Sequence, residues 1–339
     1  MDSIYWVISR DCNQHCGHCY NDSEPGAPGL TKDEVSRCVE NLPDPRDVPV
    51  GRIGLSGGEV YVWPDLLFHT LTLLKQKYGK GTILSVQTNG DLLTEDLLDT
   101  TLGFNVNKFA VSSMDKYHLP STLANRPRLE ALFGSRGFEI IHFDGTPASS
   151  APEQRTVSFW GATEDLWIGP LWPRGRAMKN ALSKCTTKDD YCGGHSSGAK
   201  NFLKYRTMGE GATLAFQLSD VYPCCPMTCR PVGDLRNERL TDMLDRLARH
   251  PAYQALNEGK PEKMGEYMGL SEDYGKQRSK ELGNHCLWCD EFFTKHATDL
   301  LHPGARTERG TIDLTIQGRR LARRAEKAVA ARDAAAASS

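Results

Sequence analysis

Strand-like and helix-like segments alternate along the first 160 residues of this 339-residue chain. Short apolar runs that are typical of strands lie at residues 4–8, 53–55, 83–87, 109–113, 138–143 and 156–160. Helical patterns lie between the earlier runs, at residues 31–42, 64–77, 94–102 and 126–133. Because strands that alternate with helices pair side by side in parallel, this order predicts an α/β fold built on a parallel sheet.

The first helical pattern carries one of the eleven cysteines on its apolar face. Thr31 and Glu34 have the spacing of a capping box, which starts the helix. Val35, Cys38 and Leu42 then fall on one side of it. We therefore expect Cys38 to be a core residue rather than a metal ligand.

Three cysteines follow the first strand at C-x3-C-x2-C spacing: Cys12, Cys16 and Cys19. Three thiolates on one short loop can hold three irons of a [4Fe–4S] cube and leave the fourth iron open to a small molecule. Structural zinc sites instead use four protein ligands, usually as paired C-x2-C units. The spacing therefore favours a cluster with one open iron, and the alternatives are a zinc knuckle or a reduced, unligated set of thiols.

A second motif, Ser56-Gly57-Gly58-Glu59, follows the second strand, and the two motifs together resemble the signature of radical S-adenosylmethionine (radical SAM) enzymes. The resemblance implies that the open iron chelates SAM and that one electron from the cluster yields a 5′-deoxyadenosyl radical. It implies that Gly57, Gly58 and Glu59 receive the amino group of SAM, and that His18 lies against the adenine. It also implies a partial (β/α)6 TIM-like barrel, open on one side, with the cluster and SAM at the carboxyl ends of the strands.

Further SAM contacts are expected at the ends of the third and fourth strands, because βα-loops carry the chemistry in parallel α/β proteins. The candidates for the ribose and carboxylate of SAM are Gln87, Asn89, Ser112 and Ser113. For Asn89, which precedes a glycine, the alternative is an ordinary turn.

Residues 171–177 resemble a Gly-Arg-Ala segment found near the end of the radical domain in many members of this family. The segment makes Arg176, or Arg174, a candidate partner for a carboxylate of SAM or substrate, since a guanidinium fork matches that group. The alternative is a surface arginine at the start of a helix.

A second group of cysteines lies beyond residue 180: Cys185, Cys192, Cys224, Cys225, Cys229, Cys286 and Cys289. With the apolar run 213–218, the turn after it and the helical pattern from residue 240, the group resembles the SPASM and twitch extensions of radical SAM enzymes. The resemblance implies an auxiliary [4Fe–4S] cluster, with Cys192, Cys224, Cys286 and Cys289 as its expected ligands. Cys185 competes with Cys192, and Cys225 or Cys229 competes with Cys224. A structural zinc site is the alternative for the whole group.

The motifs divide the chain into a radical SAM core over residues 1–180, an auxiliary cluster domain over residues 181–302, and a basic, Ala-rich, partly disordered tail over residues 303–339. The net charge of −2 gives no electrostatic case for nucleic acid. No apolar stretch of about 20 residues occurs, and the N-terminus lacks a signal pattern, so we expect a cytoplasmic protein without a membrane span. Eleven cysteines in that compartment favour metal ligation over disulfides.

These features predict a radical SAM enzyme that abstracts hydrogen from a substrate C–H bond, with an electron donor such as flavodoxin or ferredoxin. Cys225 is the candidate hydrogen donor to the substrate radical, which would make the outcome an epimerisation rather than an oxidation. Since the first strand begins near Ile4, with no peptide-binding domain ahead of it, we expect a small biosynthetic metabolite such as a sugar, aminocyclitol or nucleoside. The alternatives are maturation of a ribosomally made peptide, and a non-catalytic iron–sulfur or zinc-binding interaction protein.

Overall fold

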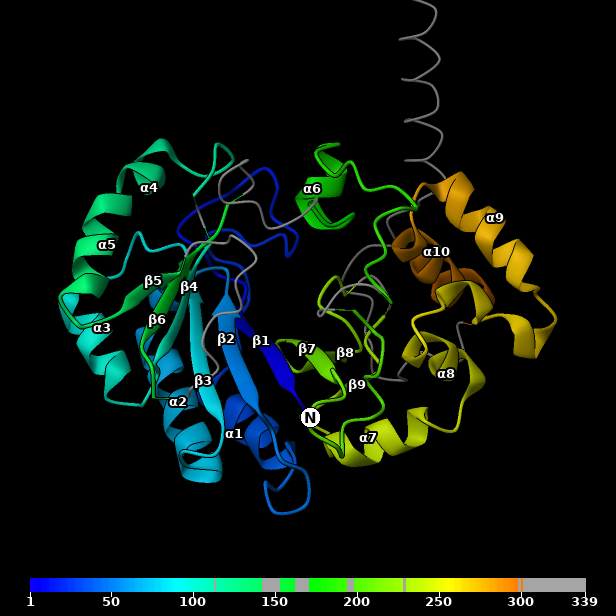
Figure 1. Ribbon diagram of the computed structural model, residues 1–339, viewed down its shortest axis with the longest axis horizontal. Coiled ribbons are helices and arrows are strands. Elements are labelled where there is room, and N and C mark those ends of the chain that lie inside the picture. The colour runs from blue at the N-terminus through cyan, green and yellow to red at the C-terminus, as the bar shows by residue number, and fades with distance from the viewer. Residues whose placement is uncertain are drawn as a thin grey trace, which may run out of the picture. The chain divides into compact units, whose positions relative to one another are not determined.

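The computed structural model describes residues 1–112, 114–141, 153–161, 171–193, 198–227, 230–297 and 300 (Figure 1). These residues belong to one compact unit, Met1–His302, and Pro303–Ser339 form a second unit. The expected tail therefore lies outside the described residues, as do the candidate residues Ser113 and Cys229.

A single sheet runs through the described part of the chain, and most of its strands are parallel. The strands are β1 (Ser3–Ser9), β2 (Arg52–Gly57), β3 (Ile83–Thr88), β4 (Lys108–Val111), β5 (Glu139–Ile141), β6 (Thr156–Phe159), β7 (Thr213–Gln217), β8 (Asp220–Tyr222) and β9 (Gly233–Asp234). They lie in the order β5-β6-β4-β3-β2-β1-β7-β8-β9 (Figure 1). Only the pairs β7–β8 and β8–β9 are antiparallel. All six strands expected in the first 160 residues are confirmed, and so is the mixed α/β class.

Two features of the strand order do not follow the order of the chain. β6 lies between β4 and β5, so the last two of the six expected strands are exchanged. β7 pairs in parallel with β1, which extends the sheet on its other side. The sheet is thus continuous from residues before 180 to residues after it, and its described strands leave two open edges, β5 and β9.

The four helices expected in the first 160 residues and the helix expected from residue 240 are present. The helical segments are α1 (Lys32–Asn41), η1 (Val60–Val62), α2 (Pro64–Tyr78), α3 (Glu95–Leu102), α4 (Pro120–Ala124), α5 (Arg126–Gly134), α6 (Gly175–Lys179), α7 (Leu240–Leu247), α8 (Pro251–Asn257), η2 (Pro261–Lys263), η3 (Glu266–Met268), α9 (Glu272–Leu282), α10 (His285–Glu291) and η4 (Phe292–His296). The capping box of α1 forms as expected, with Glu34 N donating to Thr31 Oγ1 and Thr31 N donating to Glu34. Helix α1 therefore begins where the sequence indicates.

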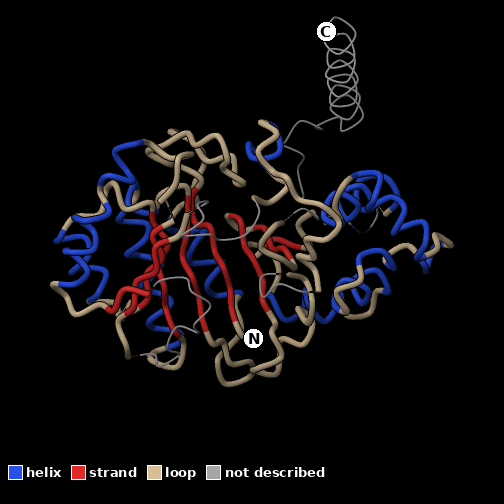
Figure 2. Tube along the Cα trace, turned by 45° about the horizontal axis from the view of Figure 1, so that its top comes forward, coloured by secondary structure: helices blue, strands red, loops and turns tan. Residues whose placement is uncertain are grey.

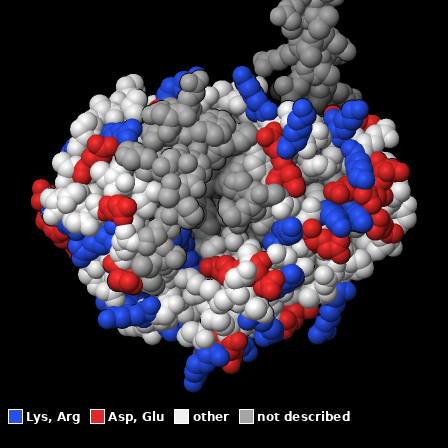
Figure 3. Space-filling model, viewed as in Figure 1, with Lys and Arg blue, Asp and Glu red and all other residues white. Residues whose placement is uncertain are grey.

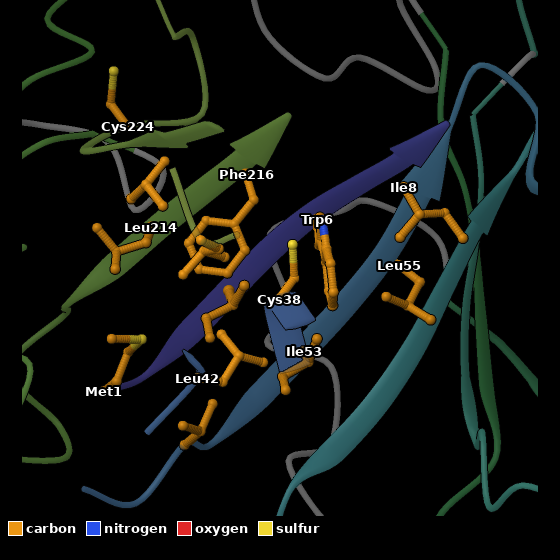
Figure 4. Close-up of a cluster of buried hydrophobic side chains, with 14 of the residues drawn as sticks. Met1, Trp6, Ile8, Cys38, Leu42, Ile53, Leu55, Leu214, Phe216 and Cys224 are labelled. Carbon is orange, nitrogen blue, oxygen red and sulfur yellow. The ribbon is translucent and has the colours of Figure 1, made fainter. Parts of the chain in front are cut away.

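One face of the sheet packs against helices and forms the core. Alternate residues of a strand point to opposite faces, and on this face the strand residues are large and apolar. Figure 4 shows part of this core, with Met1, Trp6, Ile8, Cys38, Leu42, Ile53, Leu55, Leu214, Phe216 and Cys224 labelled. Cys38 is fully buried there, so its assignment to the core is confirmed, and burial raises the pKa of its thiol to about 12.

The opposite face of the sheet is polar. Register places Val7 beside both Ser56 and Gln217, and Gln87 beside Ala110. The polar side chains on this face include Tyr5, Ser56, Gln87, Ser112 and Gln217, and these five are here called the polar face. Two pairs of them are hydrogen-bonded, Tyr5 Oη to Ser56 Oγ at 2.7 Å and Gln87 Nε2 to Ser112 Oγ at 3.0 Å. A parallel sheet with a polar face leaves that face to be covered by loops or by a ligand rather than by a hydrophobic core.

On the surface shown in Figure 3, acidic and basic side chains are interspersed, in keeping with the net charge of −2. No helix among the described residues is both long and apolar enough to cross a membrane.

Candidate cluster and SAM site

The segment that leads into the cysteine triad contacts the Gly-Gly-Glu turn at the carboxyl ends of β1 and β2. Gly58 N donates to Ser9 O at 2.8 Å, and Glu59 N donates to Asp11 O at 2.9 Å. A Cβ atom on Gly58 would lie 2.3 Å from Asp11 O, so only glycine allows this approach. Figures 1 and 2 show the loops gathered at this end of the strands, with the loop after β1 in dark blue in Figure 1.

The loop that carries the cysteine triad, residues 12–19 and here called the triad loop, has Cys12 and Gln14 buried, His15 exposed and its other residues half-buried. Gln14 N donates to Cys12 Sγ at 3.4 Å, and Ser23 N donates to Cys19 Sγ at 3.4 Å. Burial, with the neighbouring cysteines, raises the pKa of Cys12 and Cys16 to about 12. Cys12 and Cys16 therefore stay protonated until a metal group displaces their protons, as expected for ligands of a cluster.

Asp91, which sequence reasoning missed, anchors the triad loop to the loop after β3. Its Oδ2 accepts from Gln14 Nε2 at 2.6 Å, Asn13 Nδ2 at 3.3 Å and Thr122 Oγ1 at 3.0 Å. Asn89 Nδ2 donates to Asn13 Oδ1 at 2.8 Å. The sequence could have indicated Asp91 by its position, because Asn89 and Asp91 flank a glycine at the end of a strand.

Glu59 is 1% exposed, and both of its carboxylate oxygens are engaged within the protein. Oε1 accepts from Thr88 Oγ1 at 2.7 Å and Tyr61 N at 3.1 Å, while Oε2 accepts from Asn89 N at 2.6 Å. Burial outweighs these bonds and raises the pKa of Glu59 to about 7. With two lone pairs on each oxygen, one acceptor position on Oε2 remains for a ligand.

His18 lies in a small group of rings beside the triad loop. Its ring centroid is 5.1 Å from that of Tyr117 and 4.7 Å from that of His118. Asp115 Oδ1 lies 2.8 Å from His118 Nδ1. Burial lowers the pKa of His18 to about 4, so its ring is neutral at physiological pH. The sequence pattern Asp-x-x-His at residues 115–118 could have indicated this pair.

Metal-binding atoms of Cys16, His18 and His118 lie within 4.8 Å of one another. Thiol and imidazole ligands suit zinc as well as iron. If the triad loop bound zinc instead of a cluster, these three residues would be its ligands.

Arg176, which is distant in sequence from the triad loop, forms hydrogen bonds with it. Its side chain is 8% exposed, so the surface alternative for this residue is wrong. Arg176 Nε donates to Cys16 O at 2.8 Å, its guanidinium also bonds to Ser23 O, and its backbone N donates to Cys19 O at 2.8 Å. These partners are carbonyl groups of the protein, whereas a carboxylate of SAM or substrate was expected.

The four cysteines expected to hold an auxiliary cluster line one pocket. Cys192, Cys224, Cys286 and Cys289 are each 8% exposed or less and surround it together with apolar residues. Cys286 and Cys289 lie one turn apart on α10, whose N-cap residue Asn284 accepts from Cys286 N at 2.8 Å. Burial and the neighbouring thiols raise the pKa of Cys192 and Cys224.

Two competing cysteines lie elsewhere. Cys185 does not line the pocket, and its thiol donates to Leu171 O at 2.9 Å. Cys225, 6% exposed, packs with Val7, Ala215 and Tyr222 beside Tyr5 of the polar face. The adjacent residues Cys224 and Cys225 thus lie in different places, the first at the pocket and the second beside the polar face. The spacing of cysteines in the sequence does not indicate this difference.

Comparisons with known proteins agree with the motifs. The model of the radical SAM superfamily matches residues 6–113, and no curated protein matches the chain. Among solved structures, BtrN in complex with AdoMet and 2-DOIA is 15% identical, with 80% of this chain and 89% of that chain covered and a TM-score of 0.48. Native anSMEcpe with bound AdoMet and Cp18Cys peptide is 14% identical, with 88% and 98% covered and a TM-score of 0.46. SuiB of Streptococcus suis bound to S-adenosylmethionine is 13% identical, with 75% and 67% covered and a TM-score of 0.44.

The matched residues 6–113 contain the cysteine triad, the Gly-Gly-Glu turn, most of β1 and all of β2 to β4. This part of the chain is therefore similar to the radical SAM superfamily, and its three thiols fit a [4Fe–4S] cluster with one iron open to SAM.

Proposed function

We propose that this protein is a radical SAM enzyme that abstracts a hydrogen atom from a C–H bond of a small polar metabolite. The observation that carries the proposal is the contact of Ser9 and Asp11, which lead into the triad loop, with the Gly-Gly-Glu turn at the carboxyl ends of β1 and β2. The donor set fits the cofactors, because three thiols on one loop leave one iron free for SAM. When bound, the cluster and SAM supply a 5′-deoxyadenosyl radical.

The residues of the chain hold the reactants and exclude water. Asp91 and Arg176 fix the triad loop through its side-chain amides and carbonyl groups. The polar face offers hydroxyl and amide groups, which recognise substrate hydroxyls and amines by hydrogen bonds and reject analogues that lack them. This supports a sugar, aminocyclitol or nucleoside as substrate.

The substrate class is tested with anaerobically reconstituted protein, SAM and dithionite. We expect 5′-deoxyadenosine to form faster with one of a panel of aminocyclitols, sugars and nucleosides than without substrate. Deuterium on the substrate carbon should appear in 5′-deoxyadenosine. Stimulation by candidate precursor peptides alone would replace the metabolite with a peptide, and no 5′-deoxyadenosine under any condition would favour a non-catalytic role.

We further propose that Cys192, Cys224, Cys286 and Cys289 bind an auxiliary [4Fe–4S] cluster. Four buried thiols around one pocket match the ligand number of such a cluster, and of structural zinc. Reconstituted protein should carry about eight irons per chain, and about four after Cys286 and Cys289 are changed to Ala. About four irons in both proteins, with one zinc in the first, would identify the zinc alternative.

Cys225 is the proposed hydrogen donor if the outcome is an epimerisation. Its thiol would give a hydrogen atom to the substrate carbon radical and become a thiyl radical. One electron from the external donor and one proton from solvent would restore the thiol. Because a thiol exchanges with solvent, product formed in D2O should carry one deuterium, and Cys225→Ala should cleave SAM without forming that product. Cys185→Ser is the matched control, because the Cys185 thiol donates to Leu171 O and does not belong to the group of residues around Cys225. Deuterium-free product would instead indicate an oxidation.

A further inference from the structure

A short segment between the two cysteine sites contacts both of them. The segment comprises residues 174–180 and is here called the clamp; it includes α6 (Figure 1). At its centre Gly175 has φ +55°, and a Cβ atom there would lie 2.5 Å from Tyr20 O and 2.6 Å from Cys19 O. Only glycine allows the clamp to approach the triad loop this closely.

The C-terminal half of the clamp holds the triad loop. Arg176 binds the carbonyl groups of Cys16 and Ser23 through its guanidinium and that of Cys19 through its backbone N. Asn180 Nδ2 donates to Gly17 O at 2.7 Å. The bonds thus reach residues 16, 17 and 19 of the triad loop and Ser23 just beyond it.

The N-terminal residue of the clamp holds the other site. Arg174 is 7% exposed. Its Nη2 donates to Gln217 Oε1 at 2.6 Å, and its Nη1 donates to Pro226 O at 3.2 Å. Its guanidinium also lies 5.8 Å from the ring centroid of Tyr222. Gln217 and Tyr222 belong to the β7–β8 hairpin, and Pro226 is two residues beyond the pocket residue Cys224.

The two arginines are separated only by Gly175, and both side chains are buried. Buried hydrogen-bonded networks of this kind have few alternative arrangements, so a displacement at one end is felt at the other. A metal group that draws Cys224 into its ligand position moves or fixes the Pro226 carbonyl that Arg174 binds. Through Gly175 and Arg176, the same change reaches the carbonyls of Cys16 and Cys19.

We infer that Arg174 and Arg176 are positioning residues that couple the two sites, so that an occupied four-cysteine pocket strengthens SAM binding at the triad loop. This inference rests on the auxiliary cluster proposed above. Coupling of binding free energies is reciprocal, so SAM must also tighten the binding of metal in the pocket.

A double-mutant cycle on reconstituted full-length protein tests the coupling. SAM affinity is measured from the change that SAM causes in the EPR signal of the triad cluster. Emptying the pocket with Cys286→Ala and Cys289→Ala should weaken SAM binding about five- to tenfold in the native background. In the Arg174→Ala background the same pair should change it less than about twofold, and Arg174→Lys should restore part of the effect.

Lys77→Met is the matched control, because Lys77 is likewise a cation whose side chain donates to backbone carbonyls, those of Val39, Glu40 and Leu42, away from the clamp. That background should keep the full effect of emptying the pocket. If Arg174→Ala fails to fold, the native protein still gives a test, since SAM should tighten the binding of the pocket iron by the same factor in an equilibrium competition with a chelator.

Three results would overturn the coupling. Emptying the pocket could remove about four irons and leave SAM affinity unchanged, which refutes the coupling but keeps the auxiliary cluster. An equal loss of affinity in the native and Arg174→Ala backgrounds would refute the role of the clamp. Unchanged iron after Cys286→Ala and Cys289→Ala would refute the auxiliary cluster and the coupling together, and the iron count separates this result from the first.

Discussion

Replacing Glu59 by Gln keeps the size of the side chain and removes its charge and one acceptor oxygen. In the native protein each carboxylate oxygen accepts from a backbone donor, Oε1 from Tyr61 N and Oε2 from Asn89 N. The NH2 group of Gln must therefore face one of these N–H groups, whichever way the amide turns. At least one hydrogen bond is lost, and the remaining acceptor position on Oε2 becomes weaker or disappears.

The expected magnitude follows from the charge on the acceptor. A hydrogen bond to a charged group contributes about 1.5–3 kcal/mol. If Glu59 carries the amino group of SAM through its remaining lone pair, the affinity for SAM falls by about one to two orders of magnitude, at about 1.4 kcal/mol per tenfold. Iron content should stay unchanged, because no cysteine is altered.

Titration of SAM into the reconstituted variant, followed by the EPR signal of the cluster, measures this loss. Thr88→Val is the control, since it removes one donor to Oε1 and keeps the charge of Glu59. We expect Thr88→Val to retain SAM affinity within about threefold. Equal losses in both variants would mean that Glu59 acts only by joining the ends of β2 and β3. Unchanged affinity in Glu59→Gln with intact clusters would refute a contact between this carboxylate and SAM.

Three further predictions concern assembly and stability. Gly175→Ala should lose most of the triad iron, because its Cβ would overlap two carbonyl oxygens, whereas Gly134→Ala, with no atom within 4 Å of the new Cβ, should keep it; iron analysis distinguishes the two. Because burial raises the pKa of Glu59, the protonated side chain stabilises the folded state. This contribution to the free energy of unfolding, about 3 kcal/mol at about 1.4 kcal/mol per pKa unit, is complete below about pH 4.5 and is lost as pH rises through about 7. Urea unfolding of the cluster-free chain should show this loss, and a pH-independent difference from Glu59→Gln would contradict it. Asp91→Asn should lower the free energy of unfolding by about 1–3 kcal/mol, because the new amide faces the donors of Asn13 and Gln14, and a change below about 0.5 kcal/mol would show that this anchor is unimportant.

Local patterns in the sequence were sufficient for the strands, the first helices and the two motifs. The cysteine triad lies on one loop, and the capping box of α1 spans four residues, so each feature is complete within a short stretch of chain. Hydrophobic periodicity likewise reports which residues of a helix face the core, as it does for Val35 and Cys38. The order of β5 and β6 and the pairing of β7 with β1 were not available in this way, because periodicity does not specify which strands become neighbours.

What the sequence by itself determined is the chemistry of the ligands: a three-thiol loop beside a Gly-Gly-Glu turn, and a later group of seven cysteines. Only the tertiary structure decided which of those later thiols meet, placing Cys224 at the pocket and Cys225 beside the polar face. It also decided that Arg176 binds the triad loop from 160 residues away. The physical reason is range, since ligand spacing and periodicity act over a few residues, whereas contacts between distant segments depend on how the whole chain packs.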